Sequence, residues 1–233
     1  MSVATTTFNG VVKRFGNKPA IADLSITIRE GVFMGLLGPN GSGKSTMLKL
    51  IAGLYRPDAG SVLIDGETPS HKTKAKVAYL PEIDHLYNWM TVKGTLDYIS
   101  SFYRDWDQSR ADELVRFMGL DVDANVGKLS KGMRARLKIV AAMSRNAEIV
   151  LLDEPLSGID PPSRSKVLGA ILSEYRIGSQ TIIMSTHDVV ETETLFEEVL
   201  FLKNGQVALL GDAETLREER GKSIRDLFEE VYE

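Results

Sequence analysis

Short apolar runs recur along the chain, each bounded by glycine or polar residues. They cover residues 32–37, 149–152, 181–185 and 199–202. Runs of this length are typical of strands buried on both faces, as in a parallel sheet. The segments between most of them are long enough to form helices. Strands that alternate with helices predict a parallel sheet covered on both faces.

The N-terminal part has a different period. Apolar and polar residues alternate over residues 24–28, which suits a half-exposed antiparallel strand. Apolar residues at helical spacing over 47–54 predict a helix packed against the sheet. Further strands are expected at 61–64 and 77–80, and the lysine-rich run 72–76 is expected to be a solvated loop.

From about residue 82 to residue 146 the pattern is helical and rich in aromatic side chains. The aromatic residues concerned are Tyr87, Trp89, Tyr98, Phe102, Tyr103 and Trp106. Most of them are expected to fill the core of a small helical subdomain.

The composition restricts the possible classes of protein. A chain of 233 residues with 43% hydrophobic residues fits one large domain, or one domain with an insertion. The net charge of −4 argues against nucleic acid as a partner, and the absence of cysteine excludes disulfides. No signal peptide and no apolar run of about 18 residues is present, so we expect a cytosolic chain whose membrane role would come through a partner.

The segment GPNGSGKST follows an apolar run and precedes a helical one, as a phosphate-binding loop requires. It consists of Gly38, Pro39, Asn40, Gly41, Ser42, Gly43, Lys44, Ser45 and Thr46. Its glycines let the backbone turn tightly and direct N–H groups at an anion, at the start of a helix. Lys44 is expected to reach the β- and γ-phosphates, and Ser45 to place its hydroxyl on Mg²⁺.

Two acids, Asp153 and Glu154, follow the run 149–152 at the carboxyl end of a predicted parallel strand. Ligands bind at this edge of parallel sheets. Because neighbouring strand residues point in different directions, the two acids can have separate tasks. Asp153 would hold Mg²⁺ and Glu154 would act as a general base on water. The alternative is that one acid only caps the following turn.

Ser130 lies where a helix N-cap is expected, before a helical apolar pattern. A plain cap accounts for this serine by itself. The turn also lies a short distance before the strand-end acids, and a plain cap does not account for that spacing.

Four segments, in order along the chain, resemble motifs of the nucleotide-binding subunits of ABC transporters. Gly38–Thr46 resembles the Walker A loop, and Leu129–Met133 (LSKGM) resembles the LSGGQ signature. Ile149–Glu154 is similar to Walker B with the catalytic glutamate, and Ser157–Asp160 (SGID) is similar to the D-loop. The resemblance covers essentially the whole chain.

Three single residues gain a role from this resemblance. His187 is similar to the histidine that contacts the γ-phosphate or orients the attacking water, although a core histidine is the plainer interpretation. Phe15 is similar to the aromatic residue that stacks on adenine, although a strand-end aromatic is more often part of a core. Asp160 would cross a dimer interface, and before Pro161 it also suits a helix N-cap.

The resemblance implies an assembly. Ser130 and Gly132 of one subunit would contact the γ-phosphate held by the phosphate loop of another, so that two ATP molecules lie between the subunits of a homodimer or heterodimer. A separate transmembrane permease would be the partner, with the chain peripheral on the inner face of the membrane. Some of the aromatic residues would then form a groove for a helix of the permease, and exposed aromatic residues would favour that role.

Three positions depart from the family pattern. Glu82 (in YLPE) stands where the family usually has a glutamine that contacts Mg²⁺ and the attacking water. A carboxylate is also a hard oxygen ligand, so we expect Glu82 to contact Mg²⁺ as Ser45 and Asp153 do, but it adds negative charge beside the γ-phosphate. Lys131 and Met133 replace a glycine and a glutamine of the signature. Lys131 either strengthens ATP-driven dimerisation or points to solvent. YLPE and LSKGM are more similar to export-type ATPase subunits than to importer subunits.

We therefore expect an α/β fold with a P-loop core, an antiparallel β part at the N-terminus and an inserted helical subdomain. The core would comprise residues 1–82 and 149–233, and the helical subdomain residues 83–148. The expected function is hydrolysis of Mg-ATP that powers transport, most simply export, by the permease. The alternatives are a soluble ABC ATPase acting on the ribosome or DNA, and a regulatory subunit with weak hydrolysis.

Overall fold

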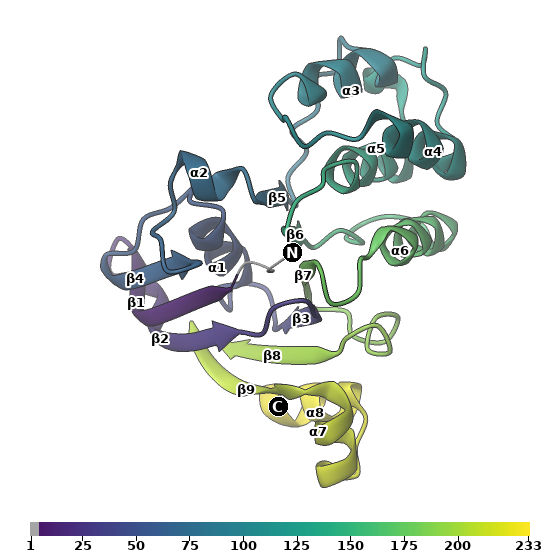
Figure 1. Cartoon of the computed structure of the whole chain (residues 1–233). Coiled ribbons are helices and arrows are strands. Elements are labelled where there is room, and N and C mark those ends of the chain that lie inside the picture. Colours follow the sequence, from purple (N-terminus) through teal and green to yellow (C-terminus); the bar gives the residue numbers. More distant parts are fainter. Residues whose placement is uncertain (1–4) are drawn as a thin grey trace.

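The computed structural model describes residues 5–233, which form two sheets flanked by helices (Figure 1). The larger sheet has the order β5-β6-β7-β3-β8-β9. Its strands are β3 (Phe33–Leu37), β5 (Val77–Leu80), β6 (Ile149–Asp153), β7 (Thr181–Thr186), β8 (Glu198–Lys203) and β9 (Gln206–Asp212). All neighbouring pairs are parallel except β8 and β9. The strands β3, β6 and β7 are buried along their whole length, as the continuous apolar runs predict.

The smaller sheet is antiparallel, with the order β2-β1-β4. It contains β1 (Thr6–Phe15), β2 (Lys18–Ile28) and β4 (Ala59–Ile64). Leu24 and Ile28 are buried while their polar neighbours are exposed, so the alternation in the sequence follows the two faces of the sheet. The α/β fold class with an antiparallel N-terminal part is therefore confirmed.

Helices cover both faces of the larger sheet. They are α1 (Lys44–Ile51), α2 (His71–Lys74), α3 (Val92–Ser100), α4 (Gln108–Met118), α5 (Lys131–Met143), α6 (Pro161–Glu174), α7 (Ala213–Arg220) and α8 (Ile224–Tyr232), with a 3-10 turn at Val126–Lys128. The helices α3, α4 and α5 lie between β5 and β6 in the sequence and project to one side of the core (Figure 1). Within residues 5–233 no helix is long and apolar enough to cross a bilayer.

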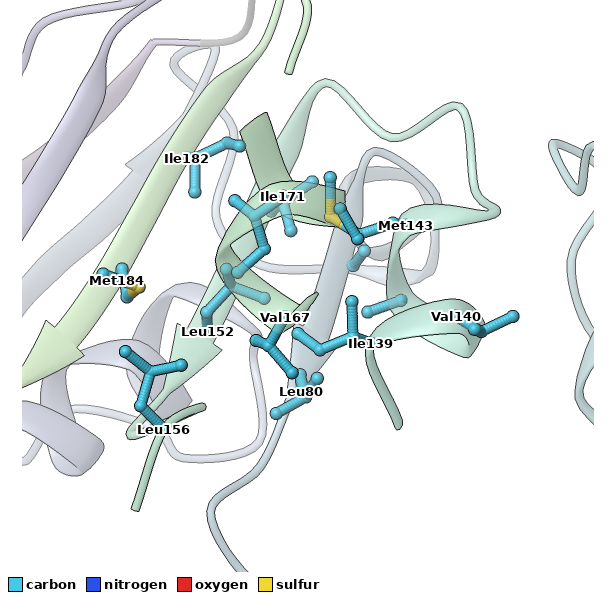
Figure 2. Packing of buried hydrophobic residues seen from close by; sticks show 14 of the residues in the cluster. Leu80, Ile139, Val140, Met143, Leu152, Leu156, Val167, Ile171, Ile182 and Met184 are labelled. Atoms are coloured by element: carbon cyan, nitrogen blue, oxygen red, sulfur yellow. The ribbon is translucent and has the colours of Figure 1, made fainter. Parts of the chain in front are cut away.

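The core consists of two clusters, one on each side of the larger sheet. In the cluster that contains α5 and α6, Ile139 and Met143 approach Val167 and Ile171, and these helices pack over Leu152 and its strand neighbours (Figure 2). The other cluster fills the space between the sheet, α1 and the antiparallel part. The loops that follow the strands of the larger sheet therefore begin from a sheet that is packed on both faces.

Three parts of the chain differ from the expectations. The aromatic residues of the helical part do not mostly fill its core, because five of the six are exposed and only Trp106 is partly buried; the exposed ones are Tyr87, Trp89, Tyr98, Phe102 and Tyr103. The lysine-rich run 72–76 is not simply a loop, because most of α2 lies within it after a capping box between Ser70 and Thr73. Lys76 is also engaged, in ion pairs with Asp65 and Glu148. In addition, β9, α7 and α8 follow residue 202, where the apolar pattern predicts no element.

Candidate functional site

The phosphate-binding loop joins the end of β3 to the start of α1. Gly41 and Gly43 have φ angles of 82° and 115°, which side chains other than hydrogen rarely allow. A Cβ on Gly43 would lie 2.4 Å from the carbonyl oxygen of Ala20. Gly43 is the N-cap of α1 and provides no side-chain cap, so N–H groups of the first turn are available to an anion.

Lys44 is buried at the base of this loop. Its ammonium donates hydrogen bonds to the carbonyl oxygens of Gly38 (2.6 Å) and Pro39 (3.2 Å). It also forms an ion pair of 3.1 Å with Glu154 Oε1. A buried charge is tolerated only with such partners, and these contacts fix the position of the cation within the loop.

Three hydroxyl groups converge on the carboxylate of Asp153. Ser45 Oγ and Ser185 Oγ donate to Oδ1 over 2.9 and 2.8 Å, and the Tyr79 hydroxyl donates to Oδ2 over 3.1 Å. Burial, followed by the negative charge of Asp153, raises the pKa of Tyr79 well above its usual value. The phenol therefore keeps its proton and remains a donor.

Glu154 is held between Lys44 and His187. Its Oε2 lies 2.9 Å from His187 Nδ1, and its backbone N–H donates to Ser185 Oγ over 2.9 Å. The φ angle of 47° is left-handed, which is unusual for glutamate and typical of strained functional residues. Glu154 lies at the end of a buried strand, and its carboxylate faces a polar cleft.

That cleft has a volume of about 350 Å³. It is lined by Ala20, Asn40, Gly41, Gly43, Lys44, Ser45, Thr46, Glu82 and Glu154. Among the described residues, the buried Ser42 Oγ at the loop has no hydrogen-bond partner, and Glu154 Oε1 has only its ion pair with Lys44. These buried polar atoms can make further hydrogen bonds, and they lie beside helix N–H groups that have no partner in the helix. Such a site fits a ligand rich in hydrogen-bond acceptors and donors, such as a nucleotide with its bound water.

The same residues suit Mg²⁺ better than a cation that needs a full protein cage. Among residues 5–233 there is no group of three or more His, Cys, Asp or Glu side chains that could hold a metal. Mg²⁺ usually keeps several waters and binds one or two carboxylates plus substrate phosphates. Ser45 and Asp153 lie together, and Glu82 reaches the cleft wall.

A second group of the expected residues lies where α5 meets α6. Ser130 caps α5 by accepting a hydrogen bond from Met133 N, and Asp160 caps α6 by accepting one from Ser163 N. The hydroxyl of Ser163 lowers the pKa of Asp160 by donating to it. A Cβ on Gly132 would lie 2.4 Å from Ser163 Oγ, so only glycine fits between the helices.

These residues do not line the phosphate cleft of their own chain. Ser130, Lys131 and Asp160 are exposed. Phe15, also outside the cleft lining, is 49% exposed at the end of β1 and contacts Tyr55 edge-on, with ring centroids 5.4 Å apart. Phe15 is therefore a surface residue of the antiparallel part rather than a core residue.

The sequence does not single out Ser185 and Tyr79, whose hydroxyls position Asp153. Ser185 belongs to the predicted strand 181–185, and a polar residue at the carboxyl end of an otherwise apolar run is the signal that could have identified it. Tyr79 gives no such signal, because a tyrosine within a strand is common.

Known proteins resemble the chain over most of its length. A family model described as ABC transporter matches residues 21–157. The Nod factor export ATP-binding protein I of Burkholderia orbicola is 35% identical over 98% of this chain and 78% of its own length. The ABC transporter ATP-binding protein YtrB of Bacillus subtilis is 32% identical over 89% of this chain and 72% of its own length.

Solved structures agree with this relationship. An ATP-binding subunit of an ABC transporter superimposes with a TM-score of 0.87 at 25% identity, over 100% of both chains. An ATP-binding cassette solved as a dimer with ADP and Pi has a TM-score of 0.76 at 24% identity, over 89% of this chain and 98% of its own, and so supports the fold. With these matches in fold and sequence, the chain belongs to the ABC transporter family, among its ATP-binding subunits.

Proposed function

We propose that the chain binds and hydrolyses Mg-ATP and thereby powers export through a separate transmembrane permease. The observation that carries the proposal is the position of Glu154. Its carboxylate borders the cleft and contacts both Lys44 (3.1 Å) and His187 (2.9 Å). A base fixed beside a phosphate loop is what hydrolysis of a nucleotide requires.

The phosphates would bind the loop residues 38–46 and Lys44, and Phe15 would stack on the base. Mg²⁺ would be held by Ser45 and Asp153, with Glu82 near it, and would neutralise phosphate charge. Glu154 would accept a proton from water, while His187 would hold the γ-phosphate or the water. Lys44 now pairs with Glu154, and the phosphates would offer it a stronger partner.

Completion of the site would require a second ATPase subunit, identical or homologous. Ser130, Gly132 and Asp160 lie outside the cleft of their own chain, where α5 and α6 begin; Ser130 and Asp160 are exposed there, and Gly132 is buried between the helices. The N-terminus of α5 there offers N–H groups to a partner's γ-phosphate. Lys131, exposed on the same turn, would add positive charge towards that phosphate.

The permease would dock at the groove between the helical segment and the core. Two cavities, of about 700 and 430 Å³, share a lining of Leu54, Tyr79, Phe102, Tyr103 and Arg145. Within this lining Phe102 is 64% exposed, and Trp89, which is linked to it through the ring contacts of Tyr87 and Tyr98, is 72% exposed. Exposed aromatic residues of this kind favour a binding surface over a purely internal role. The chain would thus be cytoplasmic and peripheral on the membrane.

The test of this function is isolation of the chain from its native membranes under mild detergent. We expect a multi-span membrane protein to copurify and to change the rate of ATP hydrolysis. Copurification with ribosomes or DNA would contradict the proposal. If a permease copurified but only a second ATPase subunit hydrolysed ATP, the result would instead indicate the regulatory role, against which Glu154 and His187 argue.

Glu82→Gln is expected to make hydrolysis less dependent on Mg²⁺. The carboxylate places a negative charge at the cleft wall, where it would repel the γ-phosphate unless Mg²⁺ neutralises the phosphate charge. Two unit charges about 4 Å apart in water interact by about 1 kcal/mol. The quantity compared is the ratio of turnover at limiting Mg²⁺ to turnover at saturating Mg²⁺. We expect this ratio to be about fivefold higher in Glu82→Gln than in the unaltered chain. The measurement is a Mg²⁺ titration of phosphate release, with Glu218→Gln on α7 as control. An unchanged titration would refute this role of Glu82.

A further inference from the structure

The end of α8 touches the strands beneath the phosphate loop. The hydroxyl of Tyr232 lies 3.0 Å from the carbonyl oxygens of both Leu37 and Leu202. Leu37 is the last residue of β3, immediately before Gly38, and Leu202 lies at the carboxyl end of β8. A single phenol proton is therefore shared between the ends of two neighbouring strands.

The carboxyl end of β8 also forms the floor of the loop. A Cβ on Gly38 would lie 2.7 Å from the carbonyl oxygen of Leu202. In the turn after β8, the N–H of Gly205 donates to the carbonyl oxygen of Ser42 over 2.9 Å. Any movement of the end of β8 relative to β3 would consequently change the shape of the loop.

The ring of Tyr232 is fixed on several sides. It stacks on Phe201 with an interplanar angle of 21° and contacts Phe228, at 4.6 Å between centroids. Lys203 reaches over the ring and donates to the carbonyl oxygen of Val231 over 2.5 Å. Burial raises the pKa of the Tyr232 phenol, which thus stays protonated as a donor. The hydroxyl has little freedom to choose another acceptor.

We propose that Tyr232 is a positioning residue for the phosphate loop. By donating to Leu37 and Leu202 it holds the ends of β3 and β8 together, so the loop has its binding shape before a nucleotide arrives. A preorganised loop loses less conformational entropy on binding. The proposal rests on the nucleotide-binding function proposed above and adds α8 (Figure 1) to the elements that determine affinity.

The chain offers a matched control. Tyr175 is also partly buried, and its hydroxyl donates to the carbonyl oxygen of Gly31 (3.1 Å) and to Glu197 Oε1 (3.2 Å). Gly31 precedes β3, whereas the phosphate loop follows it, so Tyr175 contacts the opposite end of the same strand. Tyr175→Phe and Tyr232→Phe each remove one hydroxyl and keep the ring.

The experiment compares the two variants in two measurements at a temperature where both are folded. In titrations with ATP and with ADP, Tyr232→Phe is expected to raise Kd by about three- to tenfold, the value of one hydrogen bond, while Tyr175→Phe leaves Kd unchanged. In the nucleotide-free chain, amide hydrogen exchange over residues 38–46 should be faster in Tyr232→Phe alone.

Equal loop exchange in Tyr232→Phe and the unaltered chain would overturn the proposal. The same change in both variants would also overturn it, because the effect would then be general destabilisation. If the unaltered chain bound no nucleotide, the proposed function would fail, and loop exchange would still decide the role of Tyr232.

Discussion

Glu154→Gln is expected to lower the rate of ATP hydrolysis by about 10²–10⁴-fold, the usual contribution of a general base. The amide has nearly the same shape, so the cleft and the contact with His187 remain, but it does not accept the proton of the attacking water. Phosphate release at saturating ATP measures the loss.

Nucleotide binding in this variant should persist or become tighter. The substitution removes a negative charge from the wall of the phosphate cleft, where it would oppose the bound phosphates. It also leaves the buried ammonium of Lys44 without its 3.1 Å carboxylate partner until a phosphate arrives. We therefore expect a lower unfolding temperature without nucleotide and a larger stabilisation by ATP, both measurable by calorimetry.

Glu148→Gln is the appropriate control, because it makes the same change just before the opposite end of β6, where the partly buried Glu148 pairs with Lys76. Its turnover should equal that of the unaltered chain. Turnover of Glu154→Gln close to that of the unaltered chain would remove Glu154 from the role of base.

The parts of the fold that could be predicted are those encoded locally. Residues 77–80 and 149–152 are strands because continuous apolar runs suit only buried strands at that length, and β5 and β6 coincide with them. The phosphate loop could also be predicted because its signal is local: its glycines, Lys44 and Ser45 lie within a few residues of each other. Glu154 follows its strand directly.

The contacts that could not be predicted join residues far apart in the chain. Tyr79 reaches Asp153 across β5 and β6, and Tyr232 reaches Leu37 from the other end of the sequence. Each is a tyrosine whose partner is fixed by tertiary structure: by the pairing of β5 with β6 for Tyr79, and by the packing of α8 against β8 for Tyr232. The helix α2 could not be predicted for another reason, because its only local signal is a capping box beside a lysine-rich run. The charged residues predict a solvated loop, but the capping box starts a short helix there.

Arg145 is a further residue of this kind, and it leads to the largest stability effect that we expect. It follows α5 and is almost fully buried, at 3% exposure. Its guanidinium pairs with Asp105 at 3.0 Å and donates to the carbonyl oxygens of Val77 (2.6 Å) and Ala75 (2.8 Å). It also lies 3.9 Å from the centre of the Tyr103 ring. One side chain thus fastens the helical segment to β5.

Arg145→Met should lower the free energy of unfolding by about 2–4 kcal/mol, mainly because the carbonyl oxygens of Val77 and Ala75 lose their donor at about 1–3 kcal/mol each. Methionine keeps the bulk of the stem, but it leaves Asp105 and two backbone carbonyls without their donor. Urea denaturation measures the change. The control is Arg225→Met, whose i,i+4 pair with Glu229 is exposed and should change stability by less than about 1 kcal/mol. Since Arg145 also lines the groove proposed for the permease, a stable Arg145→Met chain would mean that the remaining contacts of α5, such as those of Lys138 with the carbonyl oxygens of Glu82 and Ile83, are sufficient to hold the groove.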